Sequence, residues 1–373
     1  MPFALCAAFC LISVSAAATP ADDRAALSDL AALDLRVATI AYRLATRNVA
    51  LCTKQVPQLG MTFHAAAQYG GSFRSEAAAM FGLGDTPGVL AVVAGSPAAD
   101  AGIAVGDSIV AVGDSIVAVD GVAVAGTQGA GQSYDGVAKL EATIDAALTS
   151  PPVTLRLTRG GAARNVSLIG TPGCASRVQV EPGRKLNAYA DGTYVKLTSS
   201  VAEYAADDGE LASVIAHEMA HNILGHRALL DRQGRSRANI RSTEIAADLL
   251  SVKLVAGAGF DRHAPARFWQ RFGKKTGAGI FSDGTHLRTK ARVKLLEDAA
   301  AEYAFPLSRA PRFGSGRRQP HPAPFVPSDV EGWQRTQVSR LRSTQTDGAR
   351  GCRPNLTRFA SSPRNNISNA RLH

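Results

Sequence analysis

The chain has 373 residues and a formal net charge of +10, with 46% hydrophobic and 19% charged residues. A basic balance of this size can indicate a protein that binds nucleic acid. However, residues 306–373 contain twelve arginines and only three acidic residues, so almost all of the excess charge lies in this C-terminal segment. The segment also lacks the alternation of aromatic and basic residues that is typical of single-strand binding surfaces. We therefore expect no nucleic-acid partner.

Residues 1–18 have the pattern of a cleaved signal peptide. Residues 3–14 are apolar, and small residues follow at 15–18, where signal peptidase would cleave. The apolar run is too short to span a membrane, and no other long apolar segment follows. We therefore expect a protein that is periplasmic or secreted after cleavage and that has no integral membrane span.

Residues 19–79 are predicted to form an N-terminal helical segment. Alanine and leucine dominate residues 22–50, and both residues favour helix. We expect this helix to pack against the domain formed by the second half of the chain.

Residues 80–170 are predicted to form a β-rich module. Its expected elements are strands at 88–93, 153–157 and 165–169 and a helix at 134–148. The turn Ser96-Pro97-Ala98 and a later Gly106-Asp107 before a strand resemble the core of bacterial PDZ domains. This resemblance implies that an extended peptide or a C-terminus binds as an added strand, with residues 81–84 as the carboxylate-binding loop. The alternative is a small β-rich spacer without a ligand.

The predicted module contains a direct repeat. The heptad GDSIVAV at residues 106–112 recurs at residues 113–119. Side chains alternate between the two faces of a strand, so a seven-residue insertion would reverse the facing of everything after it. One copy is therefore expected to loop out or to form a separate hairpin arm, with Asp120-Gly121 as a hairpin turn.

Two cysteines flank this module. Export would place Cys52 and Cys174 in an oxidising compartment. A disulfide between them would tie the N-terminal helices to the start of the following domain. Closing so long a loop would add about 4–5 kcal/mol in the chain-entropy description. The alternative is that both are free buried thiols.

His217, Glu218 and His221 form the motif H-E-x-x-H in a segment with helical character, residues 211–226. On a helix the two histidines share one face and can bind one Zn²⁺, while Glu218 can take a proton from a bound water. Apolar residues around the motif predict a largely buried helix, in which polar groups without partners would be costly. The alternative is an ordinary core helix with satisfied histidines.

A zinc site needs a third protein ligand. The all-histidine continuation of the motif needs a glycine and a histidine where this chain has Leu224 and Arg227. Glu244 follows a polar, loop-like segment at 231–237 and is expected on a returning helix, with Asp248 on the same face. Glu244 can bind the metal while Asp248 orients a ligand histidine through its second nitrogen. The alternative is a solvated acidic pair, which the apolar neighbours disfavour.

These runs, at 187–192, 217–221 and 244–248, resemble the HtpX-like gluzincins, the relatives of the CAAX prenyl protease and of the periplasmic peptidase BepA. A later family element is matched by Thr285-His286 and by Arg292, although Leu287 replaces the usual proline. The resemblance covers about residues 171–303. It implies an α+β, mainly helical zincin metallopeptidase domain that binds one zinc ion through His217, His221 and Glu244.

The resemblance also implies further roles. It predicts an edge strand on which a polypeptide substrate lies as an added strand, formed by Asn187, Ala188, Tyr189 and Ala190. His286 would lie near the zinc and either stabilise the oxyanion or gate the site. Arg292 would support that arrangement through a carboxylate. His226 lies about 140° around an ideal helix from His221, so we expect it to be structural or capping.

Together these features predict a PDZ-like domain at 80–170 and a metallopeptidase domain at 171–305. The expected function is zinc-dependent endopeptidase activity on exported or misfolded envelope proteins, with Glu218 as general base. The alternative is a non-catalytic, peptide-binding envelope protein that uses the zincin fold as a scaffold. The presence of Glu218 favours the enzyme.

Residues 306–373 are rich in Pro, Ser and Arg and show no hydrophobic periodicity. This composition predicts a basic, disordered tail. Such a tail could bind acidic surfaces such as lipid headgroups, so peripheral membrane association is compatible with the sequence.

Overall fold

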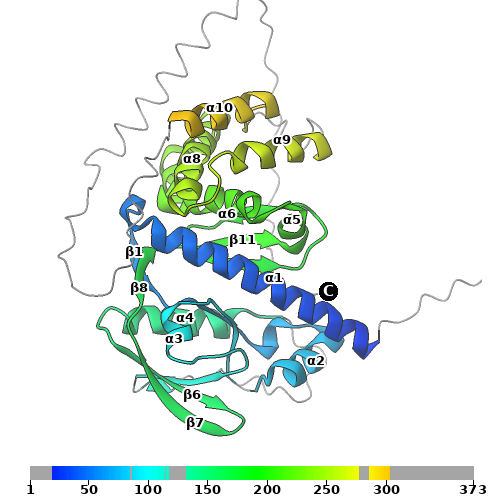
Figure 1. The fold of residues 1–373 in the computed structure, drawn as a ribbon, viewed down its shortest axis with the longest axis vertical. Coiled ribbons are helices and arrows are strands. Elements are labelled where there is room, and N and C mark those ends of the chain that lie inside the picture. The colour runs from blue at the N-terminus through cyan, green and yellow to red at the C-terminus, as the bar shows by residue number, and fades with distance from the viewer. Residues whose placement is uncertain (1–18, 85, 114, 117–131, 277–284, 303–373) are drawn as a thin grey trace, which may run out of the picture.

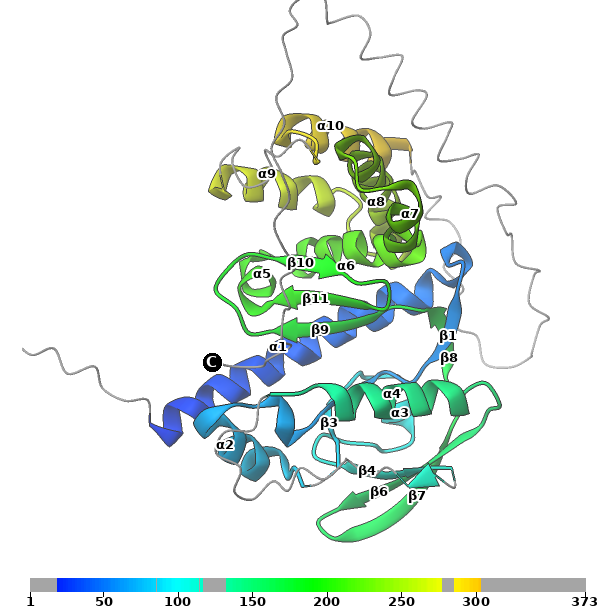
Figure 2. The ribbon, with the colours of Figure 1, turned by 180° about the vertical axis from the view of Figure 1, so that it is seen from behind.

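The computed structural model describes residues 19–84, 86–113, 115–116, 132–276 and 285–302. Two bodies that each combine helix and sheet lie on either side of the long helix α1, Pro20–Arg47 (Figures 1 and 2). The mixture of helix and sheet confirms the predicted α+β class. No helix in these ranges is both long and apolar enough to cross a membrane. The predicted signal peptide, the basic tail and the Asp120-Gly121 turn lie outside the described residues.

The first body contains a six-stranded sheet with the order β2-β3-β4-β6-β7 and with β5 paired to β4. Its strands are β2 (Met61–His64), β3 (Gly88–Val92), β4 (Ser108–Val112), β5 (Ser115–Ile116), β6 (Val153–Arg159) and β7 (Ala162–Leu168). Its helices are α2 (Gly71–Phe81), α3 (Pro97–Asp100) and α4 (Asp135–Ala147). Apolar residues of α4 and of the sheet share one core, which includes Val89, Ile109, Leu140, Leu155 and Leu157.

This sheet begins before the predicted module boundary at residue 80. The strand β2 and the helix α2 both lie within residues 19–79, which we expected to be helical. β2 has only four residues, too few for its alternation to be distinguished from that of a loop. The expected carboxylate-binding loop at 81–84 joins α2 to β3. It does not lead into the edge strand β2, which follows Leu59 and Gly60.

The repeated heptad forms a short hairpin. The first copy supplies β4, and Ser115 and Ile116 of the second copy fold back antiparallel onto Val112 and Ala111. Gly113 has φ +58°, a left-handed conformation that glycine adopts without strain and that suits this tight reversal. Of the two expected arrangements, the hairpin arm is the one that agrees with this pairing. Residues 114 and 117–119 of the second copy lie outside the described ranges.

The second body contains a three-stranded sheet and six helices among the described residues. The sheet has the order β10-β11-β9, so β10 is an edge strand. The strands are β9 (Arg177–Glu181), β10 (Ala188–Ala190) and β11 (Tyr194–Thr198). The helices are α5 (Ser199–Tyr204), α6 (Asp208–Ile223), α7 (His226–Gln233), α8 (Arg237–Gly257), α9 (Ala264–Thr276) and α10 (Thr289–Glu302).

The loop predicted at 231–237 is shorter than expected. Helix α7 continues to Gln233, and only residues 234–236 connect it to α8. Helix α7 buries His226 and Leu230, one turn apart, and most of its other residues are exposed. The polar composition of 231–233 therefore belongs to the exposed face of a short helix.

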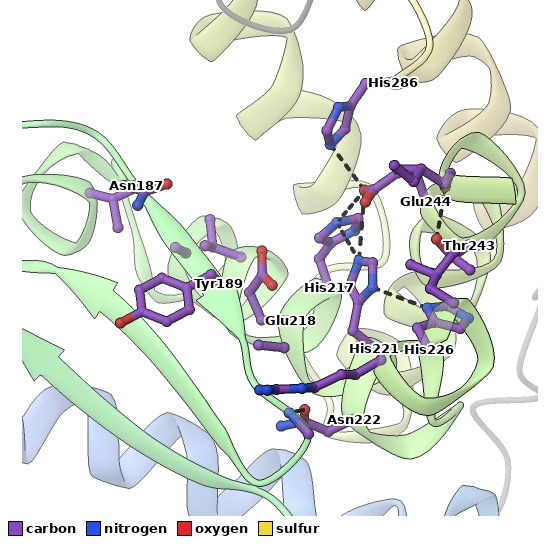
Figure 3. A pocket seen from close by; sticks show the side chains of 18 of the residues that line it. Asn187, Tyr189, His217, Glu218, His221, Asn222, His226, Thr243, Glu244 and His286 are labelled. Atoms are coloured by element: carbon purple, nitrogen blue, oxygen red, sulfur yellow. Dashed lines mark hydrogen bonds and ion pairs between the residues drawn. The ribbon is translucent and has the colours of Figure 1, made fainter. Parts of the chain in front are cut away.

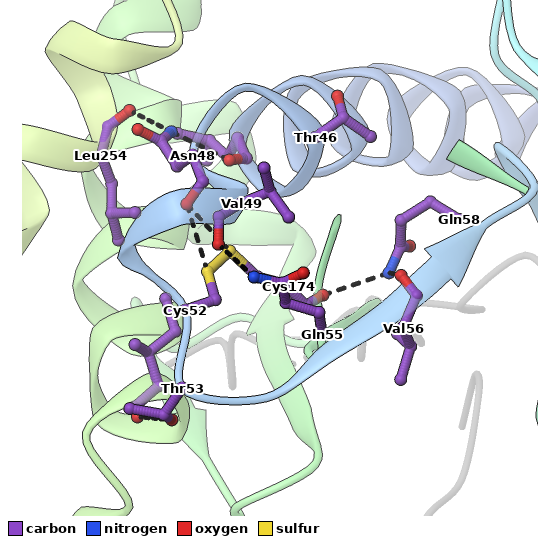
Figure 4. The surroundings of a disulfide bond; sticks show 12 residues. Thr46, Asn48, Val49, Cys52, Thr53, Gln55, Val56, Gln58, Cys174 and Leu254 are labelled. Atoms are coloured by element: carbon purple, nitrogen blue, oxygen red, sulfur yellow. Dashed lines mark hydrogen bonds between the residues drawn. A yellow bond between two sulfur atoms is a disulfide. The ribbon is translucent and has the colours of Figure 1, made fainter. Parts of the chain in front are cut away.

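Helix α1 and a short two-stranded stem connect the two bodies. The buried face of α1 packs against α2 and β3 on one side and against α6 and β9 on the other. After α1 and a 3₁₀ turn (Val49–Leu51), β1 (Gln55–Gln58) pairs antiparallel with β8 (Thr171–Cys174). A disulfide joins Cys52 to Cys174 at the base of this stem (Figure 4). The expected packing of the N-terminal helix on the second half of the chain is present.

Candidate metal centre

Helix α6 carries the H-E-x-x-H motif through the core of the second body. Asp207 caps the helix by accepting the backbone N–H of Glu210 at 2.8 Å. Leu211 and Ile215 are fully buried, and His217 is only 4% exposed. A polar ring in such surroundings requires polar partners.

Three side chains converge on one point between α6 and α8 (Figure 3). The Nε2 atoms of His217 and His221 lie 3.3 Å apart. The Oε2 atom of Glu244 lies 3.3 Å from the first nitrogen and 3.6 Å from the second. The structure therefore brings the three predicted ligands together.

These spacings fit a zinc ion. Tetrahedral bonds of about 2.0–2.1 Å place neighbouring ligand atoms about 3.4 Å apart. The Oε2 atom of Glu244 is also buried and accepts no hydrogen bond from any described residue. A buried acceptor without a donor is costly, and a cation bound between the three atoms would satisfy it. His217, His221 and Glu244 are therefore a suitable donor set for one zinc ion.

The protein groups alone shift the protonation of these ligands. Burial would raise the pKa of Glu244, but the three imidazoles of His217, His221 and His286 outweigh it and hold that pKa well below its usual range. Burial would lower the pKa of His217, but Asp248 and Glu244 raise it to about 10. Since zinc binds neutral imidazole, metal binding would displace a proton from His217.

Asp248 and Arg292 hold the other side of the His217 ring. The Asp248 Oδ1 lies 2.9 Å from His217 Nδ1. Arg292 donates to both Asp248 oxygens, at 2.8 and 2.7 Å, and both residues are buried. Burial would raise the pKa of Asp248, but the charge of Arg292 and the contact with His217 lower it. The Arg292 guanidinium also stacks on the indole of Trp269, 3.4 Å from its centroid. Such partners orient a ligand ring and select its tautomer.

His226 has the corresponding position beside His221. The two Nδ1 atoms lie 3.0 Å apart, so the expectation of a purely structural or capping residue missed this contact. That expectation assumed one continuous helix, but α6 ends at Ile223 and Gly225 is left-handed at φ +62°. The chain turns there, and His226 begins α7. Glycine is a common signal of a helix end and could have indicated the turn. Burial, with a further contribution from His221, lowers the pKa of His226 to about 3, so the ring is neutral.

Glu218 and His286 complete the polar groups at this centre. In Figure 3 the Glu218 carboxylate lies between Tyr189 and the ligand histidines. No described residue forms a hydrogen bond or ion pair with it, so it is available to a bound water or substrate. The Nε2 atom of His286 lies 3.0 Å from Glu244 Oε2. The structure therefore brings both predicted catalytic residues to the ligand set.

The edge strand forms the other wall of the site. A cavity of about 490 Å³ lies between Asn187, Ala188, Tyr189 and Ala190 on one side and the H-E-x-x-H residues on the other. The strand proper begins at Ala188, and the Asn187 carbonyl extends the pairing by accepting the Thr198 N–H at 3.0 Å. Among the described strands β10 pairs with β11 alone, which leaves its other edge for an added strand.

Tyr189 uses its side chain within the sheet. Its hydroxyl donates to Glu181 at 3.2 Å. Burial and the Glu181 carboxylate raise the pKa of Tyr189 to about 12, so the phenol stays protonated near neutral pH. The backbone of β10, rather than this side chain, is thus the part suited to bind a polypeptide.

Part of the chain is similar to a known protein family. Residues 162–235 match the sequence model of Peptidase family M48. This match supports a metallopeptidase. It includes β10 and the H-E-x-x-H motif and stops before Glu244. The M48 family is zinc-dependent and acts on polypeptides, in agreement with the His-His-Glu cluster. No curated protein matches the chain significantly.

Proposed function

We propose that this chain is a zinc-dependent endopeptidase that hydrolyses peptide bonds in extended polypeptides. One observation carries the proposal. The buried Glu244 Oε2, which accepts no hydrogen bond from a described residue, lies 3.3 and 3.6 Å from the Nε2 atoms of His217 and His221. The same cavity contains Glu218 and the edge strand β10. The M48 match supports the same class of enzyme.

Each polar residue of the site has a role in this reaction. A zinc ion held by His217, His221 and Glu244 would polarise the scissile carbonyl and lower the pKa of a water molecule. Glu218 accepts a proton from the attacking water and delivers it to the leaving amine. His286 donates a hydrogen bond to the carbonyl oxygen as that oxygen becomes negative. Asp248 keeps His217 in the tautomer that binds metal through Nε2.

The substrates that we propose are exported or misfolded envelope proteins. Strand addition to β10 recognises the peptide backbone, which an unfolded chain offers with little regard to its sequence. A disulfide between Cys52 and Cys174 suits an oxidising compartment, in agreement with the predicted signal peptide. We therefore propose a periplasmic or secreted location.

A digestion assay tests the mechanism. Purified protein is incubated with casein and with an unfolded outer-membrane protein, with and without chelator, and its zinc content is measured. Glu218→Gln should lower the cleavage rate by about 10²–10⁴-fold, the scale for a lost general base, and should leave the zinc content unchanged. Glu203→Gln, on the exposed face of α5, is the matched control and should cleave like wild type. Equal cleavage by Glu218→Gln would refute the mechanism, and absence of bound zinc would refute the site.

A second activity concerns the first body. The edge strand β2 and the helix α4 border a cavity of about 210 Å³, with Met61, Phe63, Ile144 and Leu148 among its lining residues. Residues of α1 and of the second body line the same cavity, among them Tyr42, Arg177 and Asn222. An edge strand beside a helix is the arrangement that takes a peptide as an added strand. We propose that this PDZ-like groove captures a peptide or C-terminus.

Peptide binding can be separated from cleavage. Fluorescence anisotropy with Glu218→Gln protein and peptides with free or amidated C-termini measures capture alone. Met61→Glu should weaken binding, because it places a charge on the apolar edge of the groove. If peptides bind while wild type cleaves nothing, the non-catalytic alternative replaces the enzyme.

A further inference from the structure

The tip of the β10–β11 hairpin is bonded to the helices of the metal centre. The side-chain Oδ1 of Asn222 accepts the Gly192 backbone N–H at 2.8 Å. Arg227 donates to the backbone carbonyl of Asp191 at 2.9 Å. Asn222 immediately follows the ligand His221 on α6, and Arg227 is in the first turn of α7. Two side chains thus attach this turn to the elements that hold the metal ligands.

Asn222 also reaches the far strand of the same sheet. Its Nδ2 donates to the Ser176 hydroxyl at 2.9 Å, next to the start of β9. Ser176 is buried. A single carboxamide therefore bridges the metal-binding helix, the hairpin tip and the strand β9, and both of its polar atoms are used.

The opposite end of β10 has a different kind of attachment. The backbone N–H of Asn187 donates to the Thr198 hydroxyl at 3.2 Å, and the Asn187 carbonyl accepts the Thr198 backbone N–H at 3.0 Å. These bonds join β10 to its own sheet and not to α6. The hairpin tip is therefore where hydrogen bonds tie the edge strand to the metal centre.

From this geometry we propose that Asn222, assisted by Arg227, is a positioning residue that sets the spacing between β10 and the metal ligands. The inference rests on the proposed peptidase function. A substrate paired with β10 places its scissile carbonyl only as accurately as β10 itself is placed. A misplacement of about 1 Å can cost about 100-fold in rate, so a loosened tip affects extended substrates and spares ligands that touch the metal alone.

Two inhibitors separate this role from a general structural one. Acetohydroxamate is a small metal-directed probe, and a peptide hydroxamate adds contacts along β10. In zinc-loaded Asn222→Ala the inhibition constant of the peptide hydroxamate should rise about tenfold or more, with acetohydroxamate unchanged within about twofold. Gly192→Ala tests the same bond from its other end, because φ +103° strains any residue with a Cβ. Equal losses for both inhibitors, or no loss for either, would overturn the proposal.

Hydrogen exchange gives a readout that does not depend on catalysis. In Asn222→Ala the amides of residues 188–194 should exchange faster than in wild type, while those of α6 stay protected. Asn165→Ala, on an exposed position of β7, is the matched control and should alter neither measurement. Unchanged exchange in the hairpin contradicts the positioning role even if wild type is a peptidase. If wild type neither binds zinc nor cleaves, the proposed function fails, and the exchange result still decides whether Asn222 holds the hairpin.

Discussion

Two carboxylates with buried oxygens, one in each body, show how a structural charge cluster differs from a candidate metal site. Asp107 in the first body accepts hydrogen bonds from Arg159 at 2.7 Å, from Arg164 at 3.2 Å and from the Ala104 N–H at 3.1 Å. Glu244 in the second body has imidazole nitrogens 3.0–3.6 Å from its Oε2, yet that atom accepts no hydrogen bond from a described residue. The first carboxylate is saturated, and the second needs a further partner.

The direction of the pKa shift does not separate the two. Burial would raise the pKa of Asp107, but hydrogen bonds from Arg159, Ala104 and Arg164 lower it. The pKa of Glu244 is lowered as well, by the imidazoles around it. What differs is the kind of partner, because guanidinium groups only donate hydrogen bonds, whereas an imidazole can also bind a metal ion through a ring nitrogen. The partners of the two carboxylates, and not the direction of their pKa shifts, therefore distinguish the candidate metal site from the structural cluster.

The largest expected effect is the loss of zinc affinity caused by the substitution Glu244→Ala. Loss of an outer partner can weaken zinc binding by about 10–100-fold, and loss of a ligand should exceed that range. Stability measured in chelator should also fall, because His217 and His286 lose the carboxylate that lies 3.3 and 3.0 Å from their ring nitrogens. Metal analysis and urea unfolding in chelator check the two parts. Full zinc occupancy in this variant would show that Glu244, like Asp107, is a structural carboxylate and not a metal ligand.

Asp248→Asn should affect both properties. It removes the anion that orients His217, so zinc affinity should fall by about 10–100-fold. It also leaves Arg292 buried without its partner, a change that typically costs about 3–5 kcal/mol. The added substitution Arg292→Gln should recover part of the stability and none of the zinc affinity. Recovery of zinc binding in the double variant would argue against the orienting role.

Asp107→Asn should lower stability alone. The substitution leaves Arg159 and Arg164 without their shared anion, but both are partly exposed, so we expect a loss of about 1–3 kcal/mol. Zinc content and cleavage rate should match those of wild type. A change in zinc affinity would mean that the two clusters are coupled through α1.

The smallest effect is the pH dependence of that stability difference. The folded-state pKa of Asp107 is lowered, so its contribution is present above about pH 3.9, the unfolded value, and declines as the pH falls through the folded-state pKa. The gap in unfolding free energy between wild type and Asp107→Asn should therefore narrow at acid pH. Urea titrations in chelator at several pH values measure it. If this difference in unfolding free energy increases toward acid pH, folding raises the pKa of Asp107 and does not lower it.

The part of the site that can be predicted from residue spacing consists of pairs of residues on a single helix. The spacing of His217 and His221, and of Glu244 and Asp248, places each pair on one helical face without knowledge of the fold. The contact of His226 was missed because Gly225 ends the helix just before it.

The disulfide and the contact of Arg292 with a carboxylate were expected, but other contacts between distant elements could not be predicted. The stacking of Trp269 on Arg292 and the bond from Asn222 to Gly192 depend on how helices and strands pack, which local periodicity does not encode. The same reason explains the missed strand β2. It becomes a strand through pairing with β3, and four residues give too little pattern of their own.

The stem of β1 and β8 makes the first body an insertion. The chain leaves the second body at Gln58 and returns at Thr171, and these two residues are paired neighbours. The disulfide between Cys52 and Cys174 joins the same two segments of the chain. Residues 59–170 therefore begin and end at neighbouring positions, so a short turn could replace them without a change in the connectivity of the second body. The first body is in this sense a self-contained insertion, which can be exchanged or lost while the second body keeps its connectivity.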